Sequence, residues 1–376
     1  MSRQRVAVIH YMPLEIYPPV MNLVRTFNAM ESATPIDIYT TRLHKNIALF
    51  TASPLTRIKR YGVSGKNGAF AARMWGYMHY YLATFFMLVK TKPDSILYYD
   101  TISSFPAILY KMIRKNRCRL FVHYHEYMSA SEYRHGMFLV KWFHQMEKQV
   151  YPKTAWLSHT NQERMDLFKA DLPGICIPQQ HVIPNFPPAS WSSGNKQIDK
   201  QPPVKIVYAG ALSMDTMYTR LFAEWILQQK EAAIWHIYTL NITAEAADYI
   251  RTLPGETIKL FEGVDYYHLP EVLKKYDAGV VLYNGHIPNY IYNAPNKLFE
   301  YAASGLDVWF PDHMQSSRQY ITINTYPKIL ALDFHQLNQV NLEQTISKTG
   351  LSYRAHPFSC EKAFSLLLQR LVNASI

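Results

Sequence analysis

One stretch of sequence decides the fold of this chain, Pro295-Asn-Lys-Leu-Phe-Glu-Tyr-Ala-Ala-Ser-Gly305. A proline at its start and a glycine at its end are typical of helix termini, so it predicts a helix of about three turns. Apolar runs flank this helix at 278–283 and 306–310 and predict buried strands. A helix between two buried strands is the repeating unit of an open parallel sheet.

The start of this helix carries groups that suit a phosphorylated ligand. Lys297 and Glu300 are three residues apart, so they share one helix face. The lysine can meet a diphosphate, the glutamate can accept hydrogen bonds from a ribose diol, and the helix N-terminus attracts anions. In an open parallel sheet this is the edge where ligands bind. Lys–Glu pairs at this spacing are also common on ordinary helix surfaces, so spacing alone leaves both interpretations open.

The rest of the chain alternates short apolar runs with helical patterns, which predicts a parallel α/β protein. Its 376 residues are enough for two domains. We expect an N-terminal domain over 1–187, a polar and proline-rich linker over 188–203, and a C-terminal domain over 204–358. The first half is predicted to hold strands at 6–9, 36–39, 96–99, 120–123 and 155–158, and helices at 20–30, 69–89, 103–114, 133–150 and 161–168. The second half is predicted to hold strands at 204–210, 234–238, 258–262, 279–282, 308–310 and 329–332, and a last helix at 363–372.

The positive charge of the chain lies in its first half. Residues 1–190 hold 23 Lys and Arg against 11 Asp and Glu, a net of +12, whereas residues 191–376 hold 16 against 17, a net of −1. We expect Lys111, Arg114 and Lys115 to face an acceptor or an anionic membrane surface, the alternative being a merely solvated basic face. No nucleic-acid-binding motif accompanies the patch, so nucleic acid is not an expected partner.

The chain is expected to lie in the cytoplasm, in contact with a membrane rather than across it. Three widely spaced cysteines do not make a disulfide framework, which fits a reducing compartment. The first apolar run is too short for a signal peptide and predicts a strand. Residues 69–89 have the length of a membrane span, but Arg73, Gly76 and His79 interrupt them. A largely buried helix is therefore predicted, with an aromatic edge that can touch the membrane interface.

The pattern P-x-K-x-x-E-Y-x-A-x-G of residues 295–305 resembles the donor-site helix of GT-B glycosyltransferases, in particular family-4-like enzymes. The resemblance implies two Rossmann-like domains with parallel sheets facing an interdomain cleft, and a final helix, 359–376, that packs back on the first domain. It implies transfer of a sugar from a nucleotide-sugar to a saccharide or lipid-linked saccharide in surface polysaccharide synthesis. Such enzymes generally need no bound metal, so neither metal nor cofactor is expected.

The resemblance also assigns the donor site. Contacts to the nucleotide-sugar are expected from Gly210, Val264, Asn293, Asn296, Lys297 and Glu300. In this assignment Lys297 binds the diphosphate and Glu300 the ribose, while Val264 contacts the base through its backbone. Gly210 ends a buried strand and lets the backbone approach the ligand, although a simple tight turn explains the same glycine.

In the first domain, His125 and Glu126 end a predicted strand and resemble the "H-E" pair of the family, so they are expected to be catalytic together with Lys297. Glu126 would serve as general base if the enzyme inverts. Glu15 is expected in an acceptor pocket. His123 and His125 share one strand face, but two histidines without a third ligand are a weak metal pattern. Asp100 ends another strand and is predicted to cap the next helix, the alternative being that it faces the acceptor.

Two departures from the family pattern leave alternatives open. Many relatives have an Arg and a Lys soon after the glycine equivalent to Gly210, whereas here no basic residue appears before Arg220. Tyr292 stands eight residues before Glu300, where retaining relatives carry a carboxylate, so retention and inversion both remain open. A nucleotide-sugar epimerase of the same architecture and a non-catalytic nucleotide-sugar or polysaccharide binding protein are the alternatives to a transferase.

Overall fold

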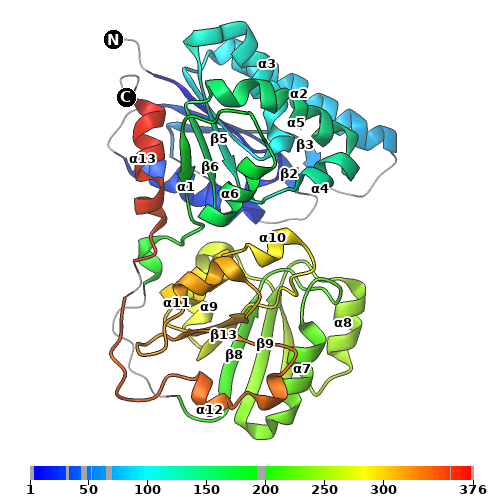
Figure 1. Ribbon diagram of the computed structural model, residues 1–376, viewed down its shortest axis with the longest axis vertical. Coiled ribbons are helices and arrows are strands. Elements are labelled where there is room, and N and C mark those ends of the chain that lie inside the picture. The colour runs from blue at the N-terminus through cyan, green and yellow to red at the C-terminus, as the bar shows by residue number, and fades with distance from the viewer. Residues whose placement is uncertain are drawn as a thin grey trace. The chain divides into compact units, whose positions relative to one another are not determined.

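The computed structural model describes residues 4–30, 34–43, 49–51, 53–64, 70–192, 200–355 and 357–373. Two compact units divide the chain (Figure 1): one comprises Met1–Pro184 and Cys360–Ile376, and the other Asn185–Ser359. Residues 188–192 and 200–203 of the predicted linker belong to the second unit, and its residues 193–199 lie outside the described residues. Residue 69 and residues 374–376 of the predicted helices also lie outside the described residues.

The first unit is a seven-stranded parallel sheet with the order β3-β2-β1-β4-β5-β6-β7. Its strands are β1 (Val6–Ile9), β2 (Ile36–Leu43), β3 (Thr56–Ser64), β4 (Ser95–Tyr99), β5 (Arg119–Tyr124), β6 (Trp156–His159) and β7 (Gln180–Val182). Its helices are α1 (Pro18–Ala29), α2 (Phe70–Thr91), α3 (Ser104–Arg114), α4 (Ala130–His135), α5 (Phe138–Val150), α6 (Gln162–Ala170) and α13 (Cys360–Val372). The strand order reverses between β1 and β4, and the carboxyl ends of strands at such a reversal are where open parallel sheets bind ligands.

Helices cover the sheet of the first unit because each buries one apolar face. Side chains of α2, α3 and α5 share a core cluster with the central strands, among them Tyr80, Ile108 and Phe143. The last helix, α13, packs against α1 (Figure 1). The Arg119 guanidinium on β5 donates to the carbonyl oxygens of Leu371 at 3.1 Å and Asn373 at 2.5 Å, which anchors the end of α13 to this unit.

A wholly buried carboxyl group holds the core of the first unit together. Glu147 of α5 accepts hydrogen bonds from the hydroxyl groups of Tyr98 at 2.9 Å, Thr101 at 2.8 Å, Tyr124 at 2.8 Å and Tyr151 at 3.3 Å. Buried polar groups are stable only where such partners exist. This network joins α5 to the carboxyl ends of β4 and β5, where the predicted catalytic residues lie.

We expect Glu147→Ala to destabilise the protein by roughly 3–5 kcal/mol, because it leaves several buried hydroxyl groups without their acceptor. Glu147→Gln keeps an acceptor oxygen and is the matched control, with a smaller expected loss. Chemical denaturation followed by tyrosine and tryptophan fluorescence would measure both. Equal loss in the two variants would show that the acceptor is unimportant.

The second unit is a six-stranded parallel sheet with the order β10-β9-β8-β11-β12-β13. Its strands are β8 (Val204–Ala209), β9 (Ala233–Thr239), β10 (Ile258–Glu262), β11 (Ala278–Val280), β12 (Asp307–Pro311) and β13 (Ile329–Leu332). Its helices are α7 (Thr219–Gln228), α8 (Ala244–Arg251), α9 (Leu269–Leu273), α10 (Pro288–Ile291), α11 (Asn296–Ala303) and α12 (Leu342–Thr345). The order reverses between β8 and β11, so this sheet also has a point of reversal at its carboxyl edge.

The decisive helix forms as its termini predict. Pro295 is the N-cap of α11, and Gly305 follows its end with φ +77°. The Leu306 N–H donates to the Tyr301 carbonyl at 3.0 Å and the Gly305 N–H to the Ala302 carbonyl at 3.0 Å, which closes the helix with a Schellman motif. Only glycine adopts this left-handed conformation without strain.

Some sequence predictions need correction. The helix predicted over 133–150 is two helices, α4 and α5, which break at Gly136, where a Cβ would come within 2.7 Å of the Glu132 carbonyl oxygen. The sequence analysis also missed β3 and β7, which lie at the two edges of the first sheet. None of the helices in the described ranges has the length and hydrophobicity needed to cross a membrane.

Candidate functional site

The carboxyl edge of the second sheet brings two predicted donor residues into contact. Gly210 directly follows β8, and its φ of +141° is a conformation that side chains rarely adopt. A Cβ at this position would lie 2.5 Å from Cε and 2.6 Å from Nζ of Lys297. The glycine therefore makes room for the lysine side chain, which lies against the backbone at the strand-order reversal.

Two tyrosine rings flank the Lys297 ammonium group. Its Nζ lies 5.4 Å from the ring centre of Tyr208 and 5.8 Å from that of Tyr283. Burial by itself lowers the pKa of Lys297, but Tyr283, Tyr208 and the Glu300 carboxylate outweigh it, so the pKa is raised above its usual range. Lys297 therefore stays protonated at neutral pH and can bind an anion.

Glu300 lies one helical turn from Lys297 and is 5% exposed. Burial raises the pKa of its carboxyl group to about 7, although the Lys297 charge opposes this shift. Near neutral pH the group therefore exists in both forms. Its ionised form can accept hydrogen bonds from a pair of hydroxyl groups.

A tyrosine of α11 fixes the helix against the sheet. The Tyr301 hydroxyl accepts a hydrogen bond from the backbone N–H of Ala209 at 2.9 Å. Its ring lies against Gly279 of β11, where any Cβ would overlap the ring. Two strands and the helix are thus locked together where Gly210 and Lys297 meet.

The other predicted donor residues lie on loops at the same edge or at the helix start. Asn296 is the first residue of α11, and the Asn293 carbonyl accepts a hydrogen bond from the Ser317 hydroxyl at 2.8 Å. Val264 follows β10 and packs against the core cluster that contains Phe299. Arg220, the first base after Gly210, lies on α7 with its guanidinium 4.5 Å from the Tyr249 ring centre.

The carboxyl edge of the first sheet holds the other predicted catalytic residues. Asp100 follows β4, and its carboxylate accepts from the backbone N–H of His125 at 2.8 Å and pairs with His125 Nδ1 at 3.1 Å. The predicted helix-capping role of Asp100 is wrong, because its side chain makes no capping hydrogen bond. A carboxylate only accepts, so Nδ1 carries the proton and Nε2 is left as a base.

The imidazole of His125 is held rigidly. It is 5% exposed, and the Tyr99 ring stacks on it at 4.7 Å between ring centres. Its Nε2 is buried and has no hydrogen-bond partner within the described residues. Asp100 has φ +56° and is strained, which is typical of functional positions. Burial by itself raises the pKa of Asp100, but His125 holds it below its usual range.

Glu126 and two further histidines complete this group. Glu126 is exposed to solvent, yet the surrounding protein limits its hydration and, together with the Asp100 charge, raises the pKa of its carboxyl group. Burial lowers the pKa of His123, whose Nδ1 lies 2.8 Å from the Ser158 hydroxyl. Burial and the neighbouring His125 lower the pKa of His10 to about 3. His10 and His123 are therefore neutral at physiological pH.

Three side chains of this group could also hold a metal ion. His10, Asp100 and His125 each offer one ligand atom, and these atoms lie within 4.8 Å of one another. The sequence suggested His123 and His125, but His123 is not in this group. His10 and Asp100 join His125 because β1, β4 and β5 are neighbours in the sheet.

The residues predicted to meet an acceptor or membrane are differently placed. Glu15 is buried and accepts from Arg60 at 2.6 Å and from the Phe50 N–H at 3.0 Å, so it has internal partners. Lys111 donates to the Cys118 carbonyl at 2.6 Å. Arg114 is half-buried, whereas Lys115 is exposed at the end of α3. The structure does not gather these four residues into one site.

Comparison with known structures identifies the architecture. Sucrose-phosphate synthase from Thermosynechococcus elongatus matches with a TM-score of 0.64 and 13% identity over 99% of this chain and 95% of that chain. The apo lipopolysaccharide outer core galactosyltransferase WaaB matches with a TM-score of 0.61 and 12% identity over 96% and 98%. A UDP-GlcNAc 2-epimerase from Neisseria meningitidis, bound to UDP-GlcNAc, matches with a TM-score of 0.57 and 12% identity over 98% of this chain and 99% of that chain. The chain has the GT-B fold. No protein-family model and no curated protein sequence matches it.

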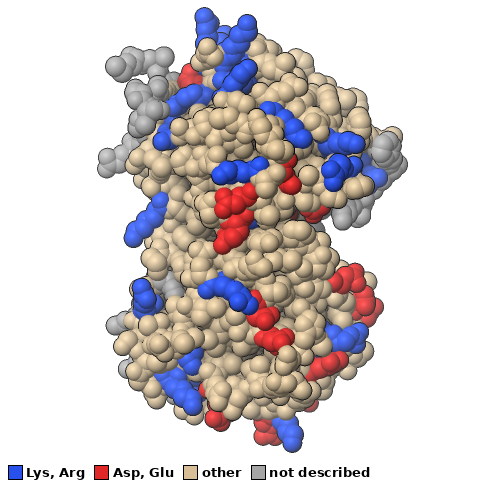
Figure 2. All heavy atoms as spheres, viewed as in Figure 1, with Lys and Arg blue, Asp and Glu red and all other residues tan. Residues whose placement is uncertain are grey.

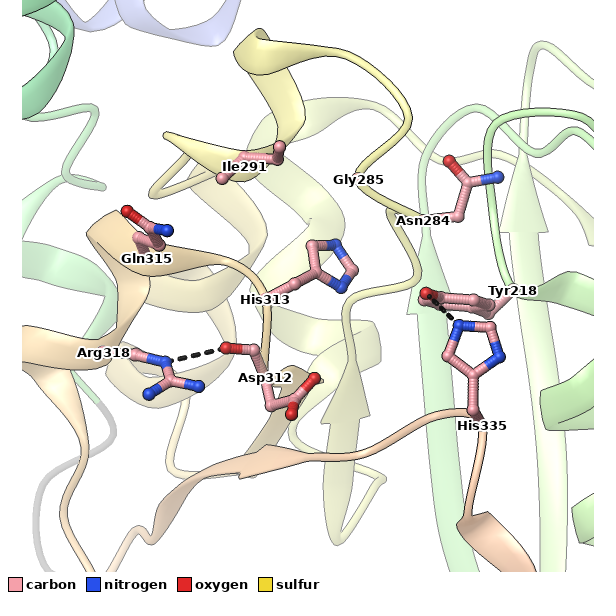
Figure 3. A pocket seen from close by; sticks show the side chains of 9 residues that line it. All are labelled: Tyr218, Asn284, Gly285, Ile291, Asp312, His313, Gln315, Arg318 and His335. Atoms are coloured by element: carbon pink, nitrogen blue, oxygen red, sulfur yellow. Dashed lines mark hydrogen bonds between the residues drawn. The ribbon is translucent and has the colours of Figure 1, made fainter.

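The predicted GT-B fold, with its two parallel sheets, is thus confirmed. The second unit of this GT-B chain has a pocket of about 740 Å³ at the ends of β11, β12 and β13 (Figure 3). Its lining residues are Tyr218, Asn284, Gly285, Ile291, Asp312, His313, Gln315, Arg318 and His335. The His335 ring bonds the Tyr218 hydroxyl at 3.0 Å, and Arg318 Nε donates to the Asp312 carbonyl at 2.7 Å. An aromatic ring among many polar groups suits a ligand rich in hydroxyl groups.

Three functional candidates, two in the second unit and one in the first, were not predicted from the sequence. Tyr208 and Tyr283 flank Lys297, and Asp100 orients His125. Tyr208 and Tyr283 lie in or beside predicted strands, where an aromatic residue is most often a core residue. The signal for Asp100 was its place at a strand end, which becomes informative once β4 and β5 are known to be neighbours.

Proposed function

We propose that this protein is a glycosyltransferase that moves a sugar from a nucleotide-sugar to a saccharide or lipid-linked saccharide acceptor at the cytoplasmic face of a membrane. One observation carries the proposal: the Lys297 ammonium lies against Gly210 where the strand order of the second sheet reverses. Ligands of open parallel sheets bind at such points. The similarity to a galactosyltransferase and to a UDP-GlcNAc-bound epimerase supports a nucleotide-sugar as ligand.

In this proposal the second unit binds the donor. Lys297 and the N-terminus of α11 bind the diphosphate, and their positive charge stabilises it further as it leaves. The ionised Glu300 accepts hydrogen bonds from the ribose diol. Val264 contacts the base, and Asn293 and Asn296 contact the sugar.

The first unit supplies the base of the reaction. His125 Nε2 takes the proton of the acceptor hydroxyl, and Asp100 stabilises the imidazolium that forms. The acceptor oxygen forms a bond to the anomeric carbon as that carbon's bond to the diphosphate oxygen breaks, and the electron pair leaves with the nucleoside diphosphate. This single displacement inverts the anomeric carbon, in keeping with Tyr292 where retaining relatives carry a carboxylate. Glu126 is proposed to assist His125 and Asp100 in this proton transfer.

Calorimetric titration with UDP- and GDP-sugars, followed by product analysis with a membrane lipid extract, tests the function. We expect one donor to bind and its sugar to appear on a lipid or saccharide acceptor. Release of free nucleotide and an epimerised sugar without acceptor would indicate an epimerase. Donor binding with neither hydrolysis nor transfer would indicate a non-catalytic binding protein. No binding by any donor would refute the assignment of Lys297 and Glu300.

Donor binding should depend on pH through Glu300. With a pKa of about 7 raised by burial, the carboxyl group is mostly ionised at pH 8 and mostly protonated at pH 6. If the ionised form binds the ribose diol, the dissociation constant should be about tenfold weaker at pH 6 than at pH 8. Glu300→Gln should bind with little pH dependence. Unchanged pH dependence in that variant would show that another group titrates.

A further inference from the structure

Helix α2 of the first unit exposes a continuous apolar stripe. Its members are Trp75, Met78, Leu82, Phe86 and Val89, with Trp75 73% and Phe86 64% exposed. Their spacing of three or four residues keeps them on one helix face. Tyr80, Thr84 and Leu88 form the opposite, buried face. Exposed apolar patches of this kind mark interaction sites, because a monomer gains nothing from leaving them in water.

A second exposed apolar pair lies at the end of α3, the neighbour of α2. Met112 and Ile113 are 60% and 62% exposed, and the exposed bases Lys115 and Arg117 follow them. Because α2 leads into the amino end of β4 and α3 into the amino end of its parallel neighbour β5, the C-terminal ends of both helices lie at the same edge of the sheet. The apolar surface therefore ends among basic side chains.

The stretches of sequence that contain the stripe and the α3 pair carry charge of one sign. The sequence has no Asp or Glu between Asp37 and Asp94, a stretch with nine Lys and Arg that includes all of α2. It also has none between Asp100 and Glu126, where five bases lie. In Figure 2 Lys and Arg outnumber Asp and Glu over the first unit, where the acidic residues lie mainly in its lower part, whereas both signs mix over the second. Such a surface complements an anionic partner.

We propose that α2 lies along an anionic lipid bilayer, with the apolar stripe inserted at the headgroup level and the surrounding bases on lipid phosphates. A Trp, Phe, Leu and Met face beside bases is the composition of interfacial helices. A second copy of this chain fits less well, because pairing two such faces brings like charges together. This surface shares Lys115 with the patch predicted from the sequence, whereas Lys111 donates to the Cys118 carbonyl.

Co-sedimentation of the full-length protein with phosphatidylcholine vesicles containing phosphatidylglycerol tests the proposal. We expect binding to vesicles with about one-third phosphatidylglycerol, weaker binding to pure phosphatidylcholine, and partial loss at high salt. Leu82→Glu/Phe86→Glu should weaken vesicle binding by at least about tenfold, because two inserted side chains become charged. Both positions are exposed, so the fold should persist, which thermal unfolding would check. Ile323→Glu changes an equally exposed residue of the second unit and should bind as the unchanged protein does.

A second readout places the stripe directly at the lipid. Trp75 fluorescence should shift to the blue with vesicles and be quenched by brominated lipids, and Trp75→Phe should remove most of that response. Equal binding by the Leu82→Glu/Phe86→Glu protein and the Ile323→Glu control would overturn the proposal. So would a dimer in light scattering that the double variant converts to monomer. Donor binding is measured separately, so failure here leaves the proposed transferase function intact, and the reverse also holds.

Discussion

Replacing Lys297 by alanine is expected to lower the transfer rate by about 10²- to 10³-fold, the usual effect of removing one charged group that stabilises a leaving group. The side chain lies between the Tyr208 and Tyr283 rings and against Gly210, so the change removes the ammonium at the helix start. Donor affinity should fall as well, because the ground-state diphosphate carries charge. Steady-state kinetics and calorimetry on the same preparation would separate the two effects.

Arg220→Ala is the matched control for this prediction. Arg220 is the nearest base after Gly210 in the sequence, but its guanidinium packs on Tyr249. We expect its loss to change donor binding less than twofold. A strong effect of Arg220→Ala together with a weak effect of Lys297→Ala would transfer the phosphate-binding role to Arg220.

The second large effect is expected in the first unit. Asp100→Asn should lower kcat by about 10²- to 10⁴-fold while donor affinity stays nearly unchanged. The asparagine oxygen can still accept a hydrogen bond from the backbone N–H of His125. The NH₂ group of the asparagine then faces Nδ1 of the imidazole. The imidazole proton then moves to Nε2, which can no longer act as base. Asparagine tolerates the positive φ of this position, so folding should persist.

His125→Ala should give a similar loss of kcat. The variant that combines Asp100→Asn with His125→Ala should be no worse than either single one, because the two groups act together.

Product stereochemistry by NMR should show inversion. Dialysis against EDTA should leave the rate unchanged, because the reaction is proposed to use no metal. Loss of activity that zinc or manganese restores would instead assign His10, Asp100 and His125 to a metal site. Additive losses in the double variant would argue against a coupled pair.

The sequence predicted most of the parallel sheets, because buried strands such as 96–99 and 279–282 are nearly continuous apolar runs. It missed β3, whose residues Thr56–Ser64 alternate bases with apolar residues because the strand lies at an edge. It also joined α4 and α5, because the apolar pattern continues across Gly136. The break depends on a backbone contact that periodicity does not reveal.

The candidate site was only partly accessible from sequence. Lys297 and Gly210 are 87 residues apart, and only the resemblance of residues 295–305 linked them before the structure brought them into contact. The pair of Asp100 and His125 was not predicted, because an aspartate at a strand end is most often a cap. Glu15 was assigned to a ligand, yet its partner is Arg60, 45 residues along the chain. Long-range ion pairs of this kind leave no local pattern.

The return of α13 to the first unit makes the second unit an insertion within the first. Asn185–Ser359 is one unbroken segment, whereas the first unit needs chain from both sides of it. As the chain leaves the ribosome, all of the second unit therefore emerges before Cys360–Val372, which the first unit still needs. A stop codon at Cys360 would damage the unit that is translated first.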